Sequence, residues 1–248
     1  MKIKKLRKIL IIVLVCVLAI SIFNIVKITH DYKTADTVNK SLQEQFIKPN
    51  NIEPSIDPIP EEKITIPISV DFEALKKAND DIVGWIYCPD TPINYPVVKS
   101  KDNTQYLRAD LNGKYLVSGT IFADYRNKDI GIDSNYIIYG HNMKNATMFG
   151  TLVKYKDQTY YDSHPILYFL TPERNYIIEL IAGAVVKRDS DIYKTAPTDN
   201  TITDIIAKST FNSTVEIGKG ENIITLSTCS YEFSHARYVV VGKIIELL

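Results

Sequence analysis

The sequence has few of the residues that build disulfide-rich or metal-dependent folds. It holds only three cysteines, Cys16, Cys88 and Cys229, in 248 residues. Three scattered cysteines are too few for a disulfide-built mini-protein, and they lack the close spacing of a zinc cluster. This disfavours a disulfide framework and a zinc cluster, and since the sequence shows no cluster of carboxylates that would form a calcium site, we predict no metal ion and no other cofactor.

The chain also lacks an excess of charge of either sign. It has 29 basic and 29 acidic residues, but five of the cations lie within Met1–Lys8. The remainder carries 24 basic and 29 acidic residues and contains no basic stripe, which disfavours nucleic-acid binding.

Long apolar runs are scarce, which excludes a multi-span membrane protein. The one such run is Ile9–Ile28, interrupted only by Ser21, Asn24 and Lys27. Its roughly 20 residues are about the length of a helix that crosses the hydrocarbon of a bilayer. A cleaved signal peptide is the alternative, but Ser21-Ile22-Phe23 is a poor cleavage site, so we expect an uncleaved anchor. The positive-inside rule then puts residues 1–8 in the cytoplasm and the rest of the chain outside the cell.

The next forty residues differ in composition from the rest. Thr29–Lys48 is polar with scattered apolar residues, and it is compatible with a helix that continues from the anchor. Pro49–Pro67 holds five prolines, which favour extended, semi-rigid chain. We predict a helical and proline-rich stalk over residues 29–68 and a folded domain, held off the membrane, over residues 69–248. Asp71 is placed to cap a short helix at Phe72–Asn79.

Beyond that helix, short apolar runs separated by turn residues predict a mainly β domain. Sixteen Tyr and eight Phe against a single Trp agree with this, because aromatic rings suit a pleated surface. The predicted strands are Gly84–Tyr87, Ser118–Ala123, Asn135–Tyr139, Ile166–Leu170, Tyr176–Val186, Asn222–Thr228 and Arg237–Ile245. Two helices are predicted between them, Ala146–Tyr155 and Thr201–Lys208, the second capped by Asp199 or Thr201. This pattern favours a barrel or a sandwich.

Cys229 is a candidate nucleophile because it follows one predicted strand and lies eight residues before Arg237, where the next begins. A short loop then places thiol and guanidinium at one rim, where the cation favours the thiolate and can stabilise an oxyanion. A buried structural cysteine is the alternative. Cys16 is read as an apolar residue of the anchor and Cys88 as part of a strand. A Cys88–Cys229 disulfide is formally possible outside the cell, but it would consume the nucleophile.

A thiol nucleophile needs an acid–base partner, and the chain offers four histidines, His30, His141, His164 and His235. His141 follows a predicted strand and Gly140, a position where rigid scaffolds present catalytic side chains. His235 lies in the loop after Cys229. Spacing alone ranks His141 only weakly above His235, and a structural role for His141 is as plausible as a catalytic one.

Three motifs in order resemble those of the sortases, the membrane-anchored cysteine transpeptidases of Gram-positive bacteria. They are Tyr139-Gly140-His141-Asn142-Met143, Thr225-Leu226-Ser227-Thr228-Cys229 and Arg237–Lys243. Further segments resemble class B sortases, namely Asn79–Ile86, Tyr95–Val98, Asp102-Asn103, Tyr106-Leu107, Gly119–Asn127 and the long insert Lys187–Glu221.

The resemblance implies a closed, eight-stranded sortase-type β-barrel with N-terminal helices and a helix in the long insert. It implies Cys229 as nucleophile, His141 as general acid and base, and Arg237 as the residue that stabilises substrate and oxyanion. Some class B enzymes carry an Asp directly after the Cys, but Ser230, Tyr231 and Glu232 follow here, so no acidic triad member is assigned. The groove residues that it implies are Asn103, Leu107 and Ser227.

The implied reaction cleaves a sorting signal near another protein's C-terminus after Thr. A thioester forms, and the protein passes to an amino group of a peptidoglycan precursor. The implied partners are surface proteins with a sorting signal, a lipid-linked wall precursor and, through the N-terminal helix, the cell membrane. Two alternatives stay open at this point. One is a pilin-polymerising sortase, and the other is a non-catalytic, membrane-tethered binding domain.

Overall fold

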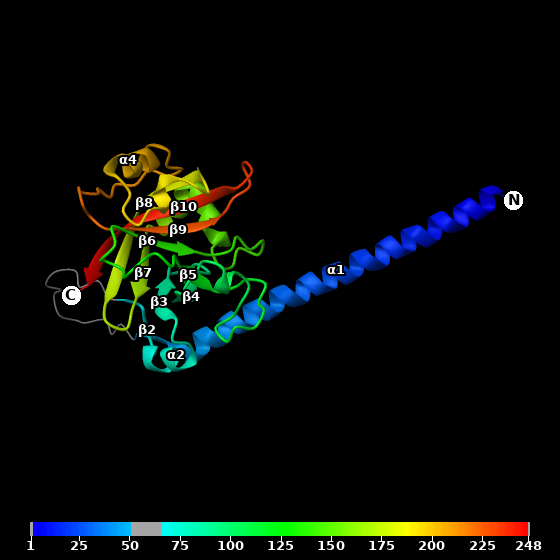
Figure 1. Cartoon of the computed structure of the whole chain (residues 1–248), viewed down its shortest axis with the longest axis horizontal. Coiled ribbons are helices and arrows are strands. Elements are labelled where there is room, and N and C mark those ends of the chain that lie inside the picture. The colour runs from blue at the N-terminus through cyan, green and yellow to red at the C-terminus, as the bar shows by residue number, and fades with distance from the viewer. Residues whose placement is uncertain (1, 51–65, 248) are drawn as a thin grey trace.

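The computed structural model describes residues 2–50 and 66–247, which form a long N-terminal helix and a β-barrel (Figure 1). Helix α1 (Lys2–Phe46) runs unbroken for 45 residues, and its N-terminal part projects away from the barrel. Within the described residues, α1 is the one helix long and apolar enough to cross a membrane. Its apolar side chains from Ile9 to Ile28 are exposed, as a lipid-facing helix requires.

Eight strands of the described chain close into the barrel, which confirms the predicted fold class. They are β3 (Ile82–Tyr87), β4 (Asn94–Val98), β5 (Ile121–Ala123), β6 (Asn135–Tyr139), β7 (Ile166–Leu170), β8 (Asn175–Lys187), β9 (Ile223–Cys229) and β10 (Ala236–Leu247). Their order around the barrel is β10-β8-β7-β3-β4-β5-β6-β9. The pairs β4·β5 and β6·β9 are parallel, and the other neighbours are antiparallel.

Alternating apolar side chains fill the interior of the barrel. The inward set comes from every strand, and it includes Ile86, Val97, Ile121, Ile138, Leu167, Ile178, Leu226 and Val240. A second buried cluster lies between the β8–β10 surface and α4 (Asp199–Ala207), and a third lies beneath α1 and α2 (Phe72–Ala78). The barrel is therefore covered on two sides, which leaves its ends to carry function.

The helices match the sequence predictions only in part. Asp71 caps α2 as predicted, with its Oδ1 accepting from the backbone N–H of Ala74 at 3.0 Å. The insert helix α4 is present, but its cap is Thr198 and not Asp199 or Thr201. The remaining short helices are η1 (Gln105–Leu107), η2 (Gly150–Lys156), α3 (Gln158–Ser163) and η3 (Asp191–Tyr193).

The predicted helix Ala146–Tyr155 is wrong in its first half. Ala146 and Met148 have positive φ angles of 60° and 54°, which end any helix there. Asn142 instead forms a β-bridge with Met148, and only the 3₁₀-helix η2 follows. Cys88 was also misplaced, because β3 ends at Tyr87 and the buried Cys88 thiol lies 3.7 Å from the Tyr155 hydroxyl.

The C-terminal end of α1 packs against the barrel. Ala35 and Phe46 are 1% and 2% exposed, and β1 (Ile47–Pro49) pairs with β2 (Ile68–Val70). The prolines at 54, 58 and 60, on which the predicted stalk depends, lie outside the described residues. The division of the chain at residues 28 and 68 stays a prediction.

Candidate active site

The register of three strands brings Cys229, His141 and Arg237 to one rim of the barrel. On one side of β9, Cys229 lies directly opposite Arg237 of β10 in an antiparallel pair. On the other side, β9 runs parallel to β6, with Tyr139 beside Ser227. Neighbouring strands lie about 4.8 Å apart, so Cys229 and Arg237 are near neighbours on the same face.

The parallel pairing continues beyond the end of β6. The Gly140 amide donates to the Ser227 carbonyl at 3.1 Å, and the Thr228 hydroxyl donates to the Gly140 carbonyl at 2.9 Å. Following the same offset, residue 141 comes alongside residue 229. A Cβ on Gly140 would lie 2.5 Å from the Ile121 side chain, so only glycine lets the backbone at this position pass so close to Ile121.

The loop that carries His141 is hydrogen-bonded to the end of β9 and is closed by contacts within itself. The Asn142 side-chain amide donates to the Cys229 carbonyl at 2.8 Å. The Phe149 amide donates to the His141 carbonyl at 3.1 Å, and the Asn142–Met148 bridge closes the loop. The imidazole therefore sits on a fixed backbone although it follows a strand end.

The His141 ring makes one recorded hydrogen bond to the described chain, from Nε2 to the Leu107 carbonyl at 2.7 Å. A carbonyl only accepts, so Nε2 carries the proton and Nδ1 of the neutral ring is the nitrogen left to act as a base. Burial lowers the pKa of His141 below 6.5, and the cation Arg108 lowers it further, although the bond to Leu107 opposes both. His141 is thus neutral at pH 7 and able to take a proton.

A cleft of about 750 Å³ opens at this rim. All the site residues named from the sequence line it, namely Asn103, Leu107, His141, Ser227, Cys229 and Arg237. The other three histidines do not: His30 is exposed on α1, His164 stacks on Tyr160, and His235 is exposed with a φ of 62°. The geometry brings the predicted set together, while the chemical role of each residue stays a prediction.

Two of the three predicted groove residues have their polar groups already occupied. The Asn103 amide donates to Asp124 Oδ2 at 3.0 Å, and its oxygen accepts from the Tyr125 amide at 3.0 Å. The Ser227 hydroxyl, 2% exposed, shares a 2.8 Å hydrogen bond with the Tyr193 hydroxyl. Leu107 differs, because its side chain is 38% exposed and its carbonyl holds His141.

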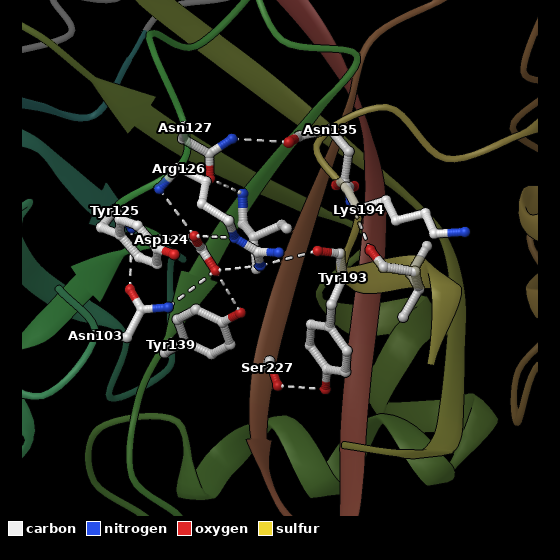
Figure 2. Close-up of polar contacts among 12 residues, drawn as sticks. Asn103, Asp124, Tyr125, Arg126, Asn127, Asn135, Tyr139, Tyr193, Lys194 and Ser227 are labelled. Carbon is white, nitrogen blue, oxygen red and sulfur yellow. Dashed lines mark hydrogen bonds and ion pairs between the residues drawn. The ribbon is translucent and has the colours of Figure 1, made fainter. Parts of the chain in front are cut away.

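Asn103 belongs to a network of polar side chains beneath the cleft, which the sequence reasoning missed (Figure 2). At its centre the fully buried Asp124 carboxylate accepts from Arg126 Nε and Nη2, at 2.8 and 2.7 Å, and from the Tyr139 hydroxyl at 2.8 Å. Burial raises the pKa of Asp124, but the hydrogen bonds from Arg126, Tyr139 and Asn103 outweigh it and hold the pKa below its usual value. Asp124 is therefore a charged structural centre.

The same network fastens the long insert to the barrel. Arg126 Nη2 donates to the Tyr193 carbonyl at 3.0 Å (Figure 2). The side-chain amide of Asn135, on β6, donates to the Ile192 and Lys194 carbonyls at 2.7 and 3.0 Å. The insert therefore forms a fixed wall of the cleft. The sequence signal for these residues is the Gly119–Asn127 segment, whose resemblance to class B sortases implies no role for Asp124 or Arg126.

Comparison with known proteins identifies the family of this fold and site. A family model described as the sortase domain matches residues 86–245. The chain belongs to the sortase family. Sortase B of Listeria monocytogenes is 37% identical over 180 residues, which cover 69% of this chain and 72% of the relative. Sortase B of Staphylococcus aureus is 36% identical over 71% of this chain and 75% of its own length.

Solved sortase structures agree with this assignment. The complex of Staphylococcus aureus sortase B with a substrate superposes with a TM-score of 0.67 and 34% identity, covering 71% of this chain and 85% of that one. Sortase B of Bacillus anthracis in complex with AAEK1 gives a TM-score of 0.70 and 31% identity, covering 88% and 100%. The protein is thus a cysteine transpeptidase of the class B type. These comparisons support neither of the two alternatives, a pilin-polymerising sortase and a non-catalytic binding domain.

Proposed function

We propose that this sortase is a membrane-anchored transpeptidase that cleaves a C-terminal sorting signal after Thr. It then transfers the cleaved protein to an amino group of a peptidoglycan precursor. Cys229 is the nucleophile, His141 the general acid and base, and Arg237 the stabiliser of substrate and oxyanion. The observation that carries the proposal is the strand register, which sets a thiol between an imidazole and a guanidinium in one cleft.

In the first half-reaction, His141 takes the proton of the Cys229 thiol. The thiolate then attacks the backbone carbonyl carbon of the Thr in the sorting signal. Negative charge gathers on the carbonyl oxygen, and Arg237 stabilises it. The carbon–nitrogen bond then breaks, and His141 gives its proton to the departing amine. A thioester with Cys229 remains.

In the second half-reaction, the acceptor amine attacks the thioester carbonyl and passes a proton to His141. The carbon–sulfur bond breaks, a new amide forms, and the Cys229 thiolate regains the proton. The lowered pKa of His141 supports this role, because a neutral imidazole is needed to accept a proton at each attack. Arg237 Nη1 donates a hydrogen bond to the Ala236 carbonyl at 2.9 Å, and the strand register sets Arg237 opposite Cys229.

The groove for the sorting peptide is assigned to Asn103, Leu107 and Ser227. Leu107 contributes an exposed apolar surface, while Asn103 and Ser227 are fixed by Asp124 and Tyr193 and shape the wall. Because class B relatives are the comparison, an Asn-Pro-x-Thr pentapeptide or a related one is the expected signal.

The membrane part of the proposal rests on α1, with residues 1–8 in the cytoplasm and the barrel outside the cell. The basic segment before the apolar run supports this orientation. A tethered enzyme meets a lipid-linked acceptor at high effective concentration.

A cleavage panel tests the proposed reaction. The full chain in vesicles is incubated with sorting pentapeptides and a scrambled control, with and without an amine acceptor, and the products are read by mass spectrometry. We expect cleavage after Thr and, with the amine, a product whose mass is that of the joined peptide. C16A is the matched cysteine control and retains activity. Cleavage that persists in C229A would contradict the proposal.

A further inference from the structure

The direction in which α1 leaves the barrel is set by three contacts. Passing toward its N-terminus, α1 meets the barrel at Gln43, whose amide donates to the Asn94 carbonyl at 2.8 Å. It next meets Met148 through Asn39, and then Asn145, whose amide lies 3.4 Å from Asp36 Oδ1. The helix thus passes the loop that carries His141 as it leaves.

The strand directions place this exit at the catalytic rim. β9 and β6 run parallel, so Cys229 and His141 lie at the same end of the barrel. β5 is antiparallel to β6 and β4 is parallel to β5, so the start of β4 at Asn94 lies at that end too. Figure 1 shows the β9–β10 loop extending from the barrel on the side from which α1 emerges.

The distance from the anchor to the barrel is short. The apolar run ends at Ile28, and Tyr32 already packs against the barrel's core cluster. Three residues of unbroken helix separate them, a rise of about 5 Å. A continuous helix has no hinge, so the part of the barrel that Tyr32 contacts is held within about one helical turn of the end of the apolar run, on the side of the catalytic rim.

The β9–β10 loop, residues 230–235, carries side chains suited to the surface of a bilayer. Tyr231 and Phe233 are 80% and 44% exposed. Between them, Glu232 is drawn back onto the barrel by an ion pair with Lys156 and a hydrogen bond from Ser230, which hold its pKa at about 2. The loop thus presents two aromatic rings while its carboxylate is paired elsewhere. Aromatic residues are enriched at the membrane–water interface, where the ring meets both apolar and polar surroundings.

We propose that the β9–β10 loop is a second membrane contact, in which Tyr231 and Phe233 enter the headgroup region of the bilayer that α1 spans. This proposal rests on the anchor and the lipid-linked acceptor of the proposed function. Cys229, the residue before the loop, then works at the membrane surface, where an acceptor amine on a lipid is presented.

Tryptophan fluorescence tests the contact directly. Trp85 is the only native tryptophan and is fully buried, so Y231W adds one surface reporter against a constant background. I132W is the matched control, because Ile132 is 69% exposed and lies before β6, at the opposite end of the barrel. Both full-length variants are reconstituted into phosphatidylcholine–phosphatidylglycerol vesicles with and without brominated phosphatidylcholine.

We expect brominated lipid to quench Y231W and leave I132W unchanged. Equal, weak quenching of both would overturn the contact. A change in Y231W emission on adding sorting peptide without vesicles would make the loop a peptide contact and would also overturn it. If the chain fails to float with vesicles, the proposed anchor and the proposed loop contact are both wrong. Cleavage of a soluble pentapeptide by the same sample tests the proposed chemistry separately.

Kinetics supply a second, independent readout. In the full chain, the double variant Y231S/F233S should cleave a soluble pentapeptide at the wild-type rate. Transfer to a vesicle-tethered peptide amine should fall by about tenfold, because α1 still tethers the enzyme but the loop no longer holds Cys229 at the headgroup level where the amine lies. I132S should change neither rate. Equal losses in both assays, or none in either, would overturn the proposal.

Discussion

The catalytic rim and the polar network beneath it contain similar residue types in opposite circumstances. In the network, Asp124 is fully buried and accepts hydrogen bonds from three side chains, and Asn103 has both ends of its amide occupied. At the rim, Cys229 and Arg237 are half-buried, and the His141 ring has one recorded partner. Side chains whose hydrogen-bonding groups all have partners hold the geometry of the site. Side chains with unused donors or acceptors are available to bind substrate.

This difference assigns distinct consequences to substitutions in the two regions. A change at the rim should remove activity and leave the fold intact, since few contacts are lost. A change in the network should lower the free energy of unfolding, because it strands a buried polar group.

The largest effect is expected for C229A, which removes the proposed nucleophile. Cleavage of a sorting pentapeptide should fall by about 10⁴-fold or more, because no other group forms the thioester. The measurement is single-turnover cleavage followed by mass spectrometry, with circular dichroism and thermal unfolding as checks on the fold. A folded C229A protein with retained turnover would show that the rim is not the reaction centre.

H141A should lower kcat/KM by about 10²- to 10⁴-fold, because it removes the proposed acid–base group. H235A is the matched control and should change the rate by less than about threefold, since His235 is exposed outside the cleft. The reverse ranking would move the acid–base role to His235.

The lowered pKa of His141 also predicts how activity varies with pH. The base must be neutral, so kcat/KM should stay high as pH falls to 6.5 and decline only at lower pH. A profile that declines from above pH 7 would contradict the burial-lowered pKa.

R237A should reduce kcat/KM by about 10²- to 10³-fold, the range found when one oxyanion donor is removed. R237K keeps the charge but not the planar fork, so it should recover part of the loss. The comparison is made on the same pentapeptide at one pH. If R237A matched the wild type, the register pair with Cys229 would be structural only.

R126A should lower the free energy of unfolding by about 3 kcal/mol, because it leaves the buried Asp124 carboxylate without its cation. The matched control is R174A, whose ion pair with Glu246 is largely exposed and should contribute far less to the free energy of unfolding. Chemical denaturation of both variants measures the difference. Equal losses would mean that the buried Arg126–Asp124 ion pair stabilises the fold no more than the exposed Arg174–Glu246 pair.

The pH dependence of stability should follow the same ion pair. The pKa of Asp124 is lower in the folded state than its ordinary value of 3.8. Its contribution to the free energy of unfolding is therefore fully present above pH 3.8 and is lost as the pH falls through the pKa of the folded state. In R126A this acid-sensitive part of the stability should shrink.

Local patterns predicted every strand of the barrel except β4 (Asn94–Val98), and Ser118–Ala123 was predicted longer than β5. β6 and β7 have the predicted bounds, because each is a short apolar run between turns. The sequence could rank His141 only weakly above His235, since that choice depends on the parallel pairing of β6 with β9, across more than eighty residues.

The errors also have local physical causes. Residues 146–155 carry a helical pattern, but the positive φ angles of Ala146 and Met148 and the bridge to Asn142 override it. Asp124 and Arg126 were visible as part of a resembling segment, yet nothing in their spacing revealed that Asn103, Tyr139 and the Tyr193 carbonyl converge on them.

The central claim is that Cys229 forms the acyl bond. The most direct measurement is to mix the full chain with a sorting pentapeptide, quench with acid, and locate the modification by mass spectrometry of proteolytic fragments. The account predicts a mass increase equal to the peptide up to and including Thr, confined to the fragment with Cys229 and removed by an added amine. An acyl group on any other residue, or cleavage with no acylated enzyme under single-turnover conditions, would contradict it.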